Sequence, residues 1–143
     1  MSLRNSPPFR ADHVGSLLRT APLKEARAKH AKGEISADAL KTVEDREIAA
    51  IIRKQEDVGL KAVTDGEFRR AFWNYDFLGR LDGVESYLGE RKIKFEGANP
   101  KPMMLRVVGK LGTFSSHPML DHFRFVKERA RVLPKMTIPS PSS

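Results

Sequence analysis

The chain has 143 residues, a formal net charge of +8 and no cysteine. It contains no apolar run of about 18 residues and no apolar leader, so the sequence excludes a membrane-spanning helix and predicts a cytoplasmic protein. The absence of cysteine excludes thiolate nucleophiles and thiolate metal ligands, and it fits a reducing compartment.

The positive charge is concentrated in the second part of the chain. Residues 1–88 carry 15 basic and 14 acidic side chains, whereas residues 89–143 carry 11 and 4. An excess of this kind attracts anions, either nucleic acid or a small acidic substrate. A solvated surface explains it equally well, and the segment lacks a recognisable nucleic-acid-binding motif, so nucleic acid is the less favoured partner.

The first half of the chain predicts strands alternating with helices. A tail at residues 1–8, expected to be disordered, precedes a strand at residues 9–14. A helix is expected at residues 22–32, and a longer amphipathic helix begins at Ser36 and ends before Gly59. A strand at residues 60–64 follows, and this order is typical of an α/β fold with parallel strands.

The second half interrupts this alternation before it resumes. Residues 69–81 are expected to be helical or irregular, with a turn at Asp82-Gly83. Residues 91–111 predict a hairpin insertion of two short strands. A helix at 118–131 and a strand at 133–138 complete the pattern. Three sheet strands are few for a parallel fold, so we expect the open sheet edges to pair with a second copy or with more of a longer protein.

Two carboxylates follow the strand at 60–64. Asp65 and Glu67 flank Gly66 at the point where the strand should end, and α/β folds bind ligands at the carboxyl ends of their strands. A binding role for these carboxylates is one interpretation. The other is that Asp65 caps the next helix and Glu67 pairs with Arg69 or Arg70 at the surface.

A second candidate follows the strand at 9–14. Gly15 and Ser16 form a turn whose backbone N–H groups and hydroxyl suit a carboxylate ligand, although a turn without a ligand would contain the same residues. His13 could be a general base or a metal ligand, but a histidine at this position is more often a hydrogen-bonded structural residue.

Two further groups are weaker candidates. His117 and His122 suggest a metal, but a spacing of five residues places them on different faces of a helix. The aromatic side chains of residues 72–77 suit stacking against a planar ring or, more commonly, packing in a core.

Several stretches together resemble the cobalamin-independent methionine synthase family, in particular its short members with a single barrel. The resemblance covers residues 9–143 and depends on the order of four motifs and the final segment: RADHVGSLLR, GEIS, KQEDVGLKAVTDGEFRR, LDGVE and KMTIPSPSS.

The resemblance implies a (β/α)₈ barrel, which typically needs about 250 residues. The chain is then an N-terminal portion of such a barrel, about three βα units with the hairpin insertion. In the family, the turn after the first strand and the glutamate after the second hold the amino-acid part of homocysteine. The matching residues here are Gly15, Ser16 and Glu67, with Asp65 and His13 beside them.

The same resemblance implies a zinc-dependent methyl transfer from a methyl-folate to homocysteine in the full-length protein. The family's zinc ligands lie in the later part of the barrel and have no counterparts here, so we expect no catalytic or metal-binding residue and no turnover from this chain alone. The alternative is an inactive, truncated barrel that acts as an oligomerising or interaction domain.

Overall fold

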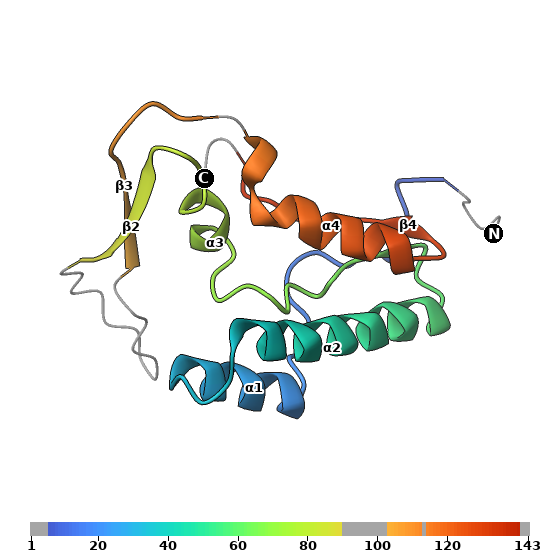
Figure 1. The fold of residues 1–143 in the computed structure, drawn as a ribbon. Helices are drawn as coiled ribbons and strands as arrows, with labels where there is room; N and C mark the ends of the chain where they lie inside the picture. The colour runs from blue at the N-terminus through green and yellow to red at the C-terminus, as the bar shows by residue number, and fades with distance from the viewer. Residues whose placement is uncertain (1–5, 90–102, 113, 141–143) are drawn as a thin grey trace, which may run out of the picture. The chain divides into compact units, whose positions relative to one another are not determined.

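The chain divides into two compact units, each described separately below (Figure 1). The computed structural model describes residues 6–89, 103–112 and 114–140. The first unit comprises Met1–Arg70 and Asp121–Thr137, and the second comprises Ala71–Leu120 and Ile138–Ser143. No helix in the described residues is long and apolar enough to cross a membrane.

The helices of the first unit confirm the sequence prediction. They are α1 (Ala21–Ala31), α2 (Ala37–Asp57) and most of α4 (Pro118–Arg129). The Thr20 hydroxyl caps α1 by accepting from the Leu23 N–H at 3.4 Å, and the Ser36 hydroxyl caps α2 by accepting from the Ala39 N–H at 3.1 Å. Each cap satisfies a backbone donor that the first helical turn leaves free, which is why the sequence marks these starts so clearly.

Two short parallel strands lie in the first unit. β1 (Ala62–Val63) pairs with β4 (Leu133–Pro134), with Ala62 opposite Leu133. The pairing confirms the expected mixed α/β class with parallel strands, although both strands are shorter than predicted. The Lys135 N–H still donates to the Val63 carbonyl at 2.8 Å, so the ladder continues one step past β4.

The core of the first unit forms where α1, α2, β1 and α4 meet. Its fully buried side chains are Leu23, Ile48, Ile52, Val63, Phe68 and Val126. Figure 1 shows α1 alongside α2. Ile48 and Ile52 are four residues apart and therefore share one face of α2, as the periodicity predicted.

The predicted strand at residues 9–14 is wrong, because this segment forms no strand. A new strand would need the free edge of β1, but the Gln55 side chain of α2 occupies that position. Its amide donates to the Thr64 carbonyl at 2.8 Å and accepts from the Thr64 N–H at 3.0 Å. These are the groups that alternate to the side of β1 away from β4.

The second unit is built on a hairpin and a short helix. β2 (Val84–Leu88) pairs antiparallel with β3 (Met103–Val107), α3 spans Tyr75–Leu78, and a 3₁₀ turn spans Phe114–Ser116. Gly83 adopts the left-handed conformation (φ +79°) at the predicted turn.

The hairpin insertion was predicted correctly in kind but not in position. Its first strand lies at Val84–Leu88, before the predicted range of 91–111, and its second strand lies within that range. Residues 90–102, which include the predicted loop, and residues 1–5 of the predicted tail lie outside the described residues.

Candidate functional site

The segment after β1 folds into a tight, buried turn. The Thr64 hydroxyl accepts from the Gly66 N–H at 3.0 Å, and the Asp65 carboxylate accepts from the Glu67 N–H at 2.9 Å. Asp65 is only 3% exposed, so its carboxylate holds the backbone of the turn. The sequence left open a helix-capping role for Asp65, but residues 66–69 form a turn and not a helix, so Asp65 holds that turn instead.

Glu67 has a strained backbone. Its φ of +57° makes it the single non-glycine residue with positive φ in the described part of the chain. The left-handed conformation costs a residue with a Cβ about 1–2 kcal/mol, and such strain is concentrated at functional sites. The strain thus marks Glu67 as a candidate binding residue independently of its charge.

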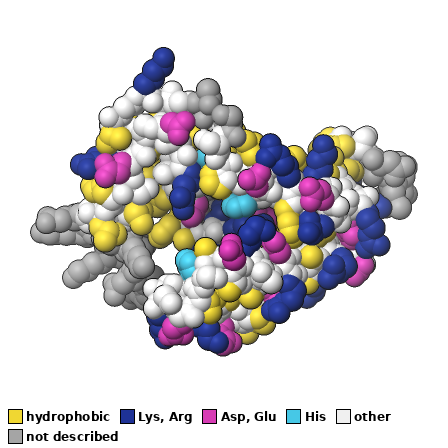
Figure 2. Space-filling model, viewed as in Figure 1, with side chains coloured by type: hydrophobic (Ala, Val, Ile, Leu, Met, Phe, Trp, Pro, Cys, Tyr) yellow, Lys and Arg dark blue, Asp and Glu magenta, His cyan; other side chains and the backbone are white. Residues whose placement is uncertain are grey.

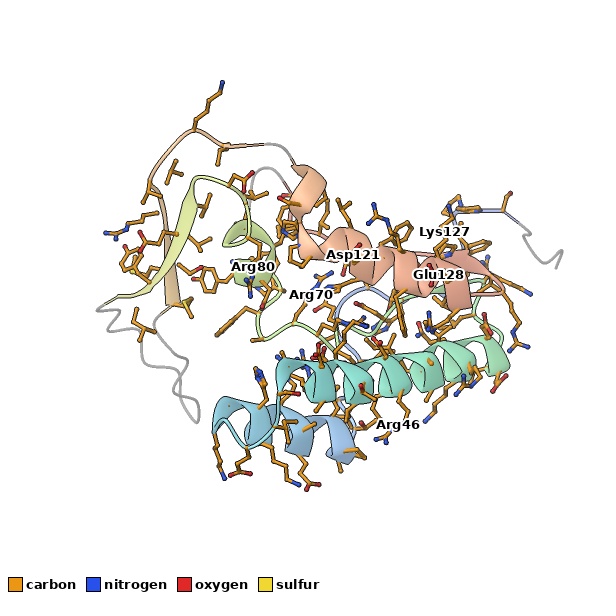
Figure 3. All side chains as sticks on the ribbon, in the orientation of Figure 1. Arg46, Arg70, Arg80, Asp121, Lys127 and Glu128 are labelled. Atoms are coloured by element: carbon orange, nitrogen blue, oxygen red, sulfur yellow. The ribbon has the colours of Figure 1, made fainter. Side chains whose placement is uncertain are left out.

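The Glu67 carboxylate is held through one of its two oxygens. Oε1 accepts from the Thr137 hydroxyl at 2.9 Å and lies 3.5 Å from Nη1 of Arg70, which Figure 3 labels. Among the described residues, no hydrogen bond reaches Oε2. The side chain pairs with Arg70 as one interpretation predicted, but it does so in a largely buried position, since Glu67 is 7% exposed.

The turn at Gly15-Ser16 lies next to this carboxylate turn. The Leu17 N–H, which follows Ser16, donates to the Gly66 carbonyl at 3.1 Å. Gly15 has a φ of +91°, and a Cβ added to it would meet no atom within 4 Å. Ser16 is exposed. The structure therefore brings together the two turns that the sequence singled out.

Arg19 ties these two turns together. Its guanidinium donates to the Glu67 carbonyl at 3.1 Å and to the Arg70 carbonyl at 2.7 Å. A planar fork with several donors can satisfy two carbonyls at once, and a lysine could not do so with the same geometry. Arg19 thereby fixes the backbone that carries Glu67.

His13 has a structural hydrogen bond. Its Nε2–H donates to the Gly15 carbonyl at 3.0 Å. The His13 side chain, two residues before Gly15, thus helps to hold the turn. Lys135, just after β4, contacts the Asp12 carboxylate and the His13 carbonyl through its ammonium group. His13 thus lies at the site, with its backbone fixed to a third segment of the chain.

Arg69 anchors the same loop to α2. Its side chain is 6% exposed, pairs with the Asp45 carboxylate, and lies 3.7 Å from the Glu44 carboxylate. Its guanidinium also lies over the Phe125 ring, 4.8 Å from the centroid. Burial raises the pKa of Glu44, although Arg69 and Arg27 oppose that rise. Burial also opposes ionisation of Asp45, but the hydrogen bond from Lys41 and the charge of Arg69 lower its pKa overall.

His117 and the aromatic candidates at residues 72–77 belong to the second unit. Both ring nitrogens of His117 are engaged in the second unit: Nε2–H donates to the Phe77 carbonyl at 2.9 Å, and Nδ1 accepts from the Met119 N–H at 3.1 Å. That leaves neither nitrogen free for a metal. Phe72 and Tyr75 pack edge to face and line a shallow hollow of about 480 Å³ in the same unit.

The residues present do not fit a zinc ion. Within residues 6–89, 103–112 and 114–140, no three His, Asp or Glu side chains are grouped closely enough to hold a metal. The chain also has no cysteine. No chemical step through zinc is assigned to it.

Opposite charges are mixed on the surface. Figure 2 shows acidic side chains among Lys and Arg on the face drawn. In the basic second part of the sequence, Arg131 pairs with Glu56 and Arg124 pairs with Asp121. The Arg131–Glu56 pair offsets part of the charge excess at residues 89–143, because Glu56 lies outside that segment.

Three site residues were missed by the sequence analysis: Arg19, Arg70 in its buried role, and Thr137. Arg19 and Arg70 each lie a few residues after a predicted turn. Their closeness in sequence to these turns could have marked them as candidate site residues. Thr137 is 70 residues from Glu67, and no local pattern indicates that contact.

The fold and the site together define a class of protein. It is a mixed α/β chain in which a buried glutamate with a strained backbone follows a parallel strand. Residues 9–104 match the family model described as "Cobalamin-independent synthase, Catalytic domain". The chain belongs to the cobalamin-independent methionine synthase family, a family of methyltransferases of methionine biosynthesis that act on small molecules.

Three relatives illustrate the match. The uncharacterized protein YxjH of Bacillus subtilis (strain 168) is 52% identical over 94% of this chain and 36% of its own length. The putative vitamin-B12 independent methionine synthase from Listeria monocytogenes, known from a crystal structure, is 44% identical in sequence to this chain. The match has a TM-score of 0.77 and covers 94% of this chain and 37% of the Listeria chain.

The third is named for its reaction. The 5-methyltetrahydropteroyltriglutamate–homocysteine methyltransferase of Synechococcus sp. (strain JA-2-3B'a(2-13)) is 33% identical over 70% of this chain and 15% of its own length. The chain thus spans little more than a third of the first two relatives and a smaller share of the third.

Proposed function

We propose that this chain forms the homocysteine-binding part of a methyltransferase that makes methionine. The observation that carries the proposal is the proximity of the Glu67 carboxylate turn to the Gly15-Ser16 turn, which the Leu17–Gly66 hydrogen bond brings about. The two turns offer opposite electrostatic character side by side, as a zwitterion requires.

Each end of an α-amino acid has a suitable partner. Glu67 Oε2, which no hydrogen bond from the described residues reaches, is available to an α-ammonium group. The backbone N–H groups of Gly15 and Ser16 donate no hydrogen bond within the described residues, so they suit an α-carboxylate. Charge-assisted hydrogen bonds of both kinds are stronger than neutral ones.

The remaining chemistry belongs to the longer protein that this proposal implies. Its fold would be a (β/α)₈ barrel, for which the parallel β1–β4 pair supplies two neighbouring strands. A methyl-folate is the proposed donor, as the Synechococcus relative's name indicates for that protein. A zinc ion supplied by other residues would activate the thiol, while this chain orients the amino-acid end of the substrate.

Calorimetric titration of the 143-residue chain with L-homocysteine tests the proposal. We expect Glu67→Gln to weaken binding about tenfold or more, because it replaces an ion pair to the ammonium with a neutral contact. Glu34→Gln is the matched control, since Glu34 is a half-exposed carboxylate paired with Lys32. Equal affinity for Glu67→Gln and the unchanged chain would contradict the proposal.

An interaction domain is the second candidate, and exposed apolar side chains favour it. Val14 and Leu18 flank the Gly15-Ser16 turn and are 73% and 86% exposed. Exposed apolar side chains beside a turn suit a surface that another chain covers. Size-exclusion chromatography with light scattering would reveal a dimer, and we expect the double variant Val14→Ser, Leu18→Ser to be a monomer. A monomer at all concentrations of the unchanged chain would count against this candidate.

A further inference from the structure

Thr137 contacts both partners of the Glu67 ion pair. Its hydroxyl donates to Glu67 Oε1 at 2.9 Å, and its carbonyl accepts from the Arg70 guanidinium. Arg70 in turn lies 3.5 Å from the same Oε1. The three residues form a closed cycle, and Thr137 contributes to it from the segment that follows β4.

This cycle distinguishes the two oxygens of one carboxylate. The last torsion of a glutamate side chain is broad and nearly two-fold, so an unrestrained carboxylate presents either oxygen. Two donors converge here on Oε1. Among the described residues, the sole fully buried side-chain nitrogen or oxygen without a partner is Nη1 of Arg69, so Oε2 retains contact with solvent. The cycle therefore occupies Oε1 and leaves Oε2 as the oxygen that a ligand can reach.

The position of Thr137 explains why a hydroxyl is needed. Arg70 is 4% exposed, and a second charged donor in that space would add another buried charge. A neutral hydroxyl orders the carboxylate while leaving it with negative charge to share with a ligand. A carboxylate that is ordered before binding loses less rotamer freedom when the ligand arrives.

We propose that Thr137 is a positioning residue that presets the Glu67 carboxylate for an α-ammonium group and so sets the preference for amino acids over their des-amino analogues. The inference rests on the proposed function, because it assumes that Glu67 receives the ammonium. The inference adds Thr137, which lies after β4, to the two turns of the site. It assigns to Thr137 the control of ligand selectivity.

Selectivity separates this role from a purely structural one. L-homocysteine and 4-mercaptobutanoate differ only in the α-ammonium group, so the ratio of their dissociation constants measures recognition of that group. A residue that merely stabilises the fold would weaken both ligands equally when changed. A residue that presets Glu67 would reduce the ratio.

The experiment uses calorimetry on the 143-residue chain with both ligands and four variants, one of which is the Glu67→Gln variant described above. We expect Thr137→Val, which keeps the shape and removes the hydroxyl, to lower the preference for homocysteine about tenfold. Thr137→Ser restores the hydroxyl and should restore the preference. Thr42→Val is the matched control, since the Thr42 hydroxyl donates only to the Asp38 carbonyl within α2.

The outcomes separate this inference from the proposed function. If Glu67→Gln abolishes the preference and Thr137→Val leaves it unchanged, the ammonium site stands and the role of Thr137 is overturned. If the unchanged chain shows no preference for homocysteine, the ammonium site fails, and the positioning role fails with it. A preference lost in Thr137→Val and regained in Thr137→Ser supports both.

Discussion

Gly66 is the residue on which the geometry of the candidate site depends most directly. Its φ is +65°, and an added Cβ would lie 3.0 Å from Cε1 of Phe68 and 3.2 Å from Cβ of Leu17. We expect Gly66→Ala to lower the free energy of unfolding by about 2–4 kcal/mol, from left-handed strain and steric overlap together. Urea unfolding followed by circular dichroism measures this loss.

Gly33→Ala separates the two causes. Gly33 also has a positive φ of +74°, but an added Cβ would meet nothing within 4 Å. Strain alone should then cost about 1–2 kcal/mol. An equal loss in the two variants would show that the contacts with Phe68 and Leu17 are not rigid.

At the scale of single residues, sequence reasoning located the turns but not their partners. The Asp65-Gly66-Glu67 sequence indicates a turn because glycine permits the left-handed conformation and Asp65 can hydrogen-bond its own backbone. The Glu67 carbonyl is held by Arg19, and its carboxylate is held by Thr137. Both depend on packing between distant segments, which a single sequence does not encode in any local pattern.

At the scale of elements, Gln55 connects α2 to β1. Its side chain is 4% exposed and bonds both the N–H and the carbonyl of Thr64. Gln55→Leu would leave two buried backbone groups without partners, so we expect a loss of about 2–4 kcal/mol in the free energy of unfolding. Thermal or urea unfolding of the purified variant measures it.

Arg53→Leu is the control for that substitution. Arg53 is exposed on the same helix, two residues earlier, so the same new side chain should change stability by less than about 0.5 kcal/mol there. Comparable losses at both positions would indicate that leucine disturbs α2 itself and that the bonds to Thr64 contribute little.

Helices were predicted well and strands poorly, and the bonding pattern explains the difference. The starts of α1 and α2 follow from hydrogen bonds between residues three apart, which the sequence contains locally. A strand exists only if another segment supplies its ladder. Gln55 occupies the edge of β1 on which a further strand could pair, and the hairpin's first strand lies at Val84–Leu88, where it pairs with β3.

At the scale of the whole molecule, carboxylates join segments that are distant in sequence. Glu56 at the end of α2 accepts from the Arg131 N–H at 2.6 Å and from its guanidinium at 2.7 Å, which connects α2 to the segment before β4. Glu44, three turns earlier on α2, faces Arg27 of α1 and Arg69 of the site loop. The arginine contacts lower both pKa values, but burial outweighs them at Glu44, so the pKa of Glu44 is raised while that of Glu56 is lowered.

The two carboxylates should therefore change stability with pH in opposite ways. The backbone hydrogen bond from Arg131 lowers the pKa of Glu56, even though burial opposes it. Its stabilisation is present above the unfolded pKa and is lost as pH falls through the folded pKa. Burial raises the pKa of Glu44, so its contribution is full below the unfolded pKa and is lost as pH rises through the folded one.

Glu56→Gln and Glu44→Gln test these signs against each other. The test is to measure the free energy of unfolding of each variant and of the unchanged chain from about pH 7 down to about pH 3. This range covers the titration of glutamate. The advantage of the unchanged chain over Glu56→Gln should shrink as the pH falls, whereas its stability relative to Glu44→Gln should rise. Each comparison is a slope, so a constant offset from a lost contact does not affect it. Parallel slopes for the two variants would show that Glu44 is not held in the buried setting that raises its pKa.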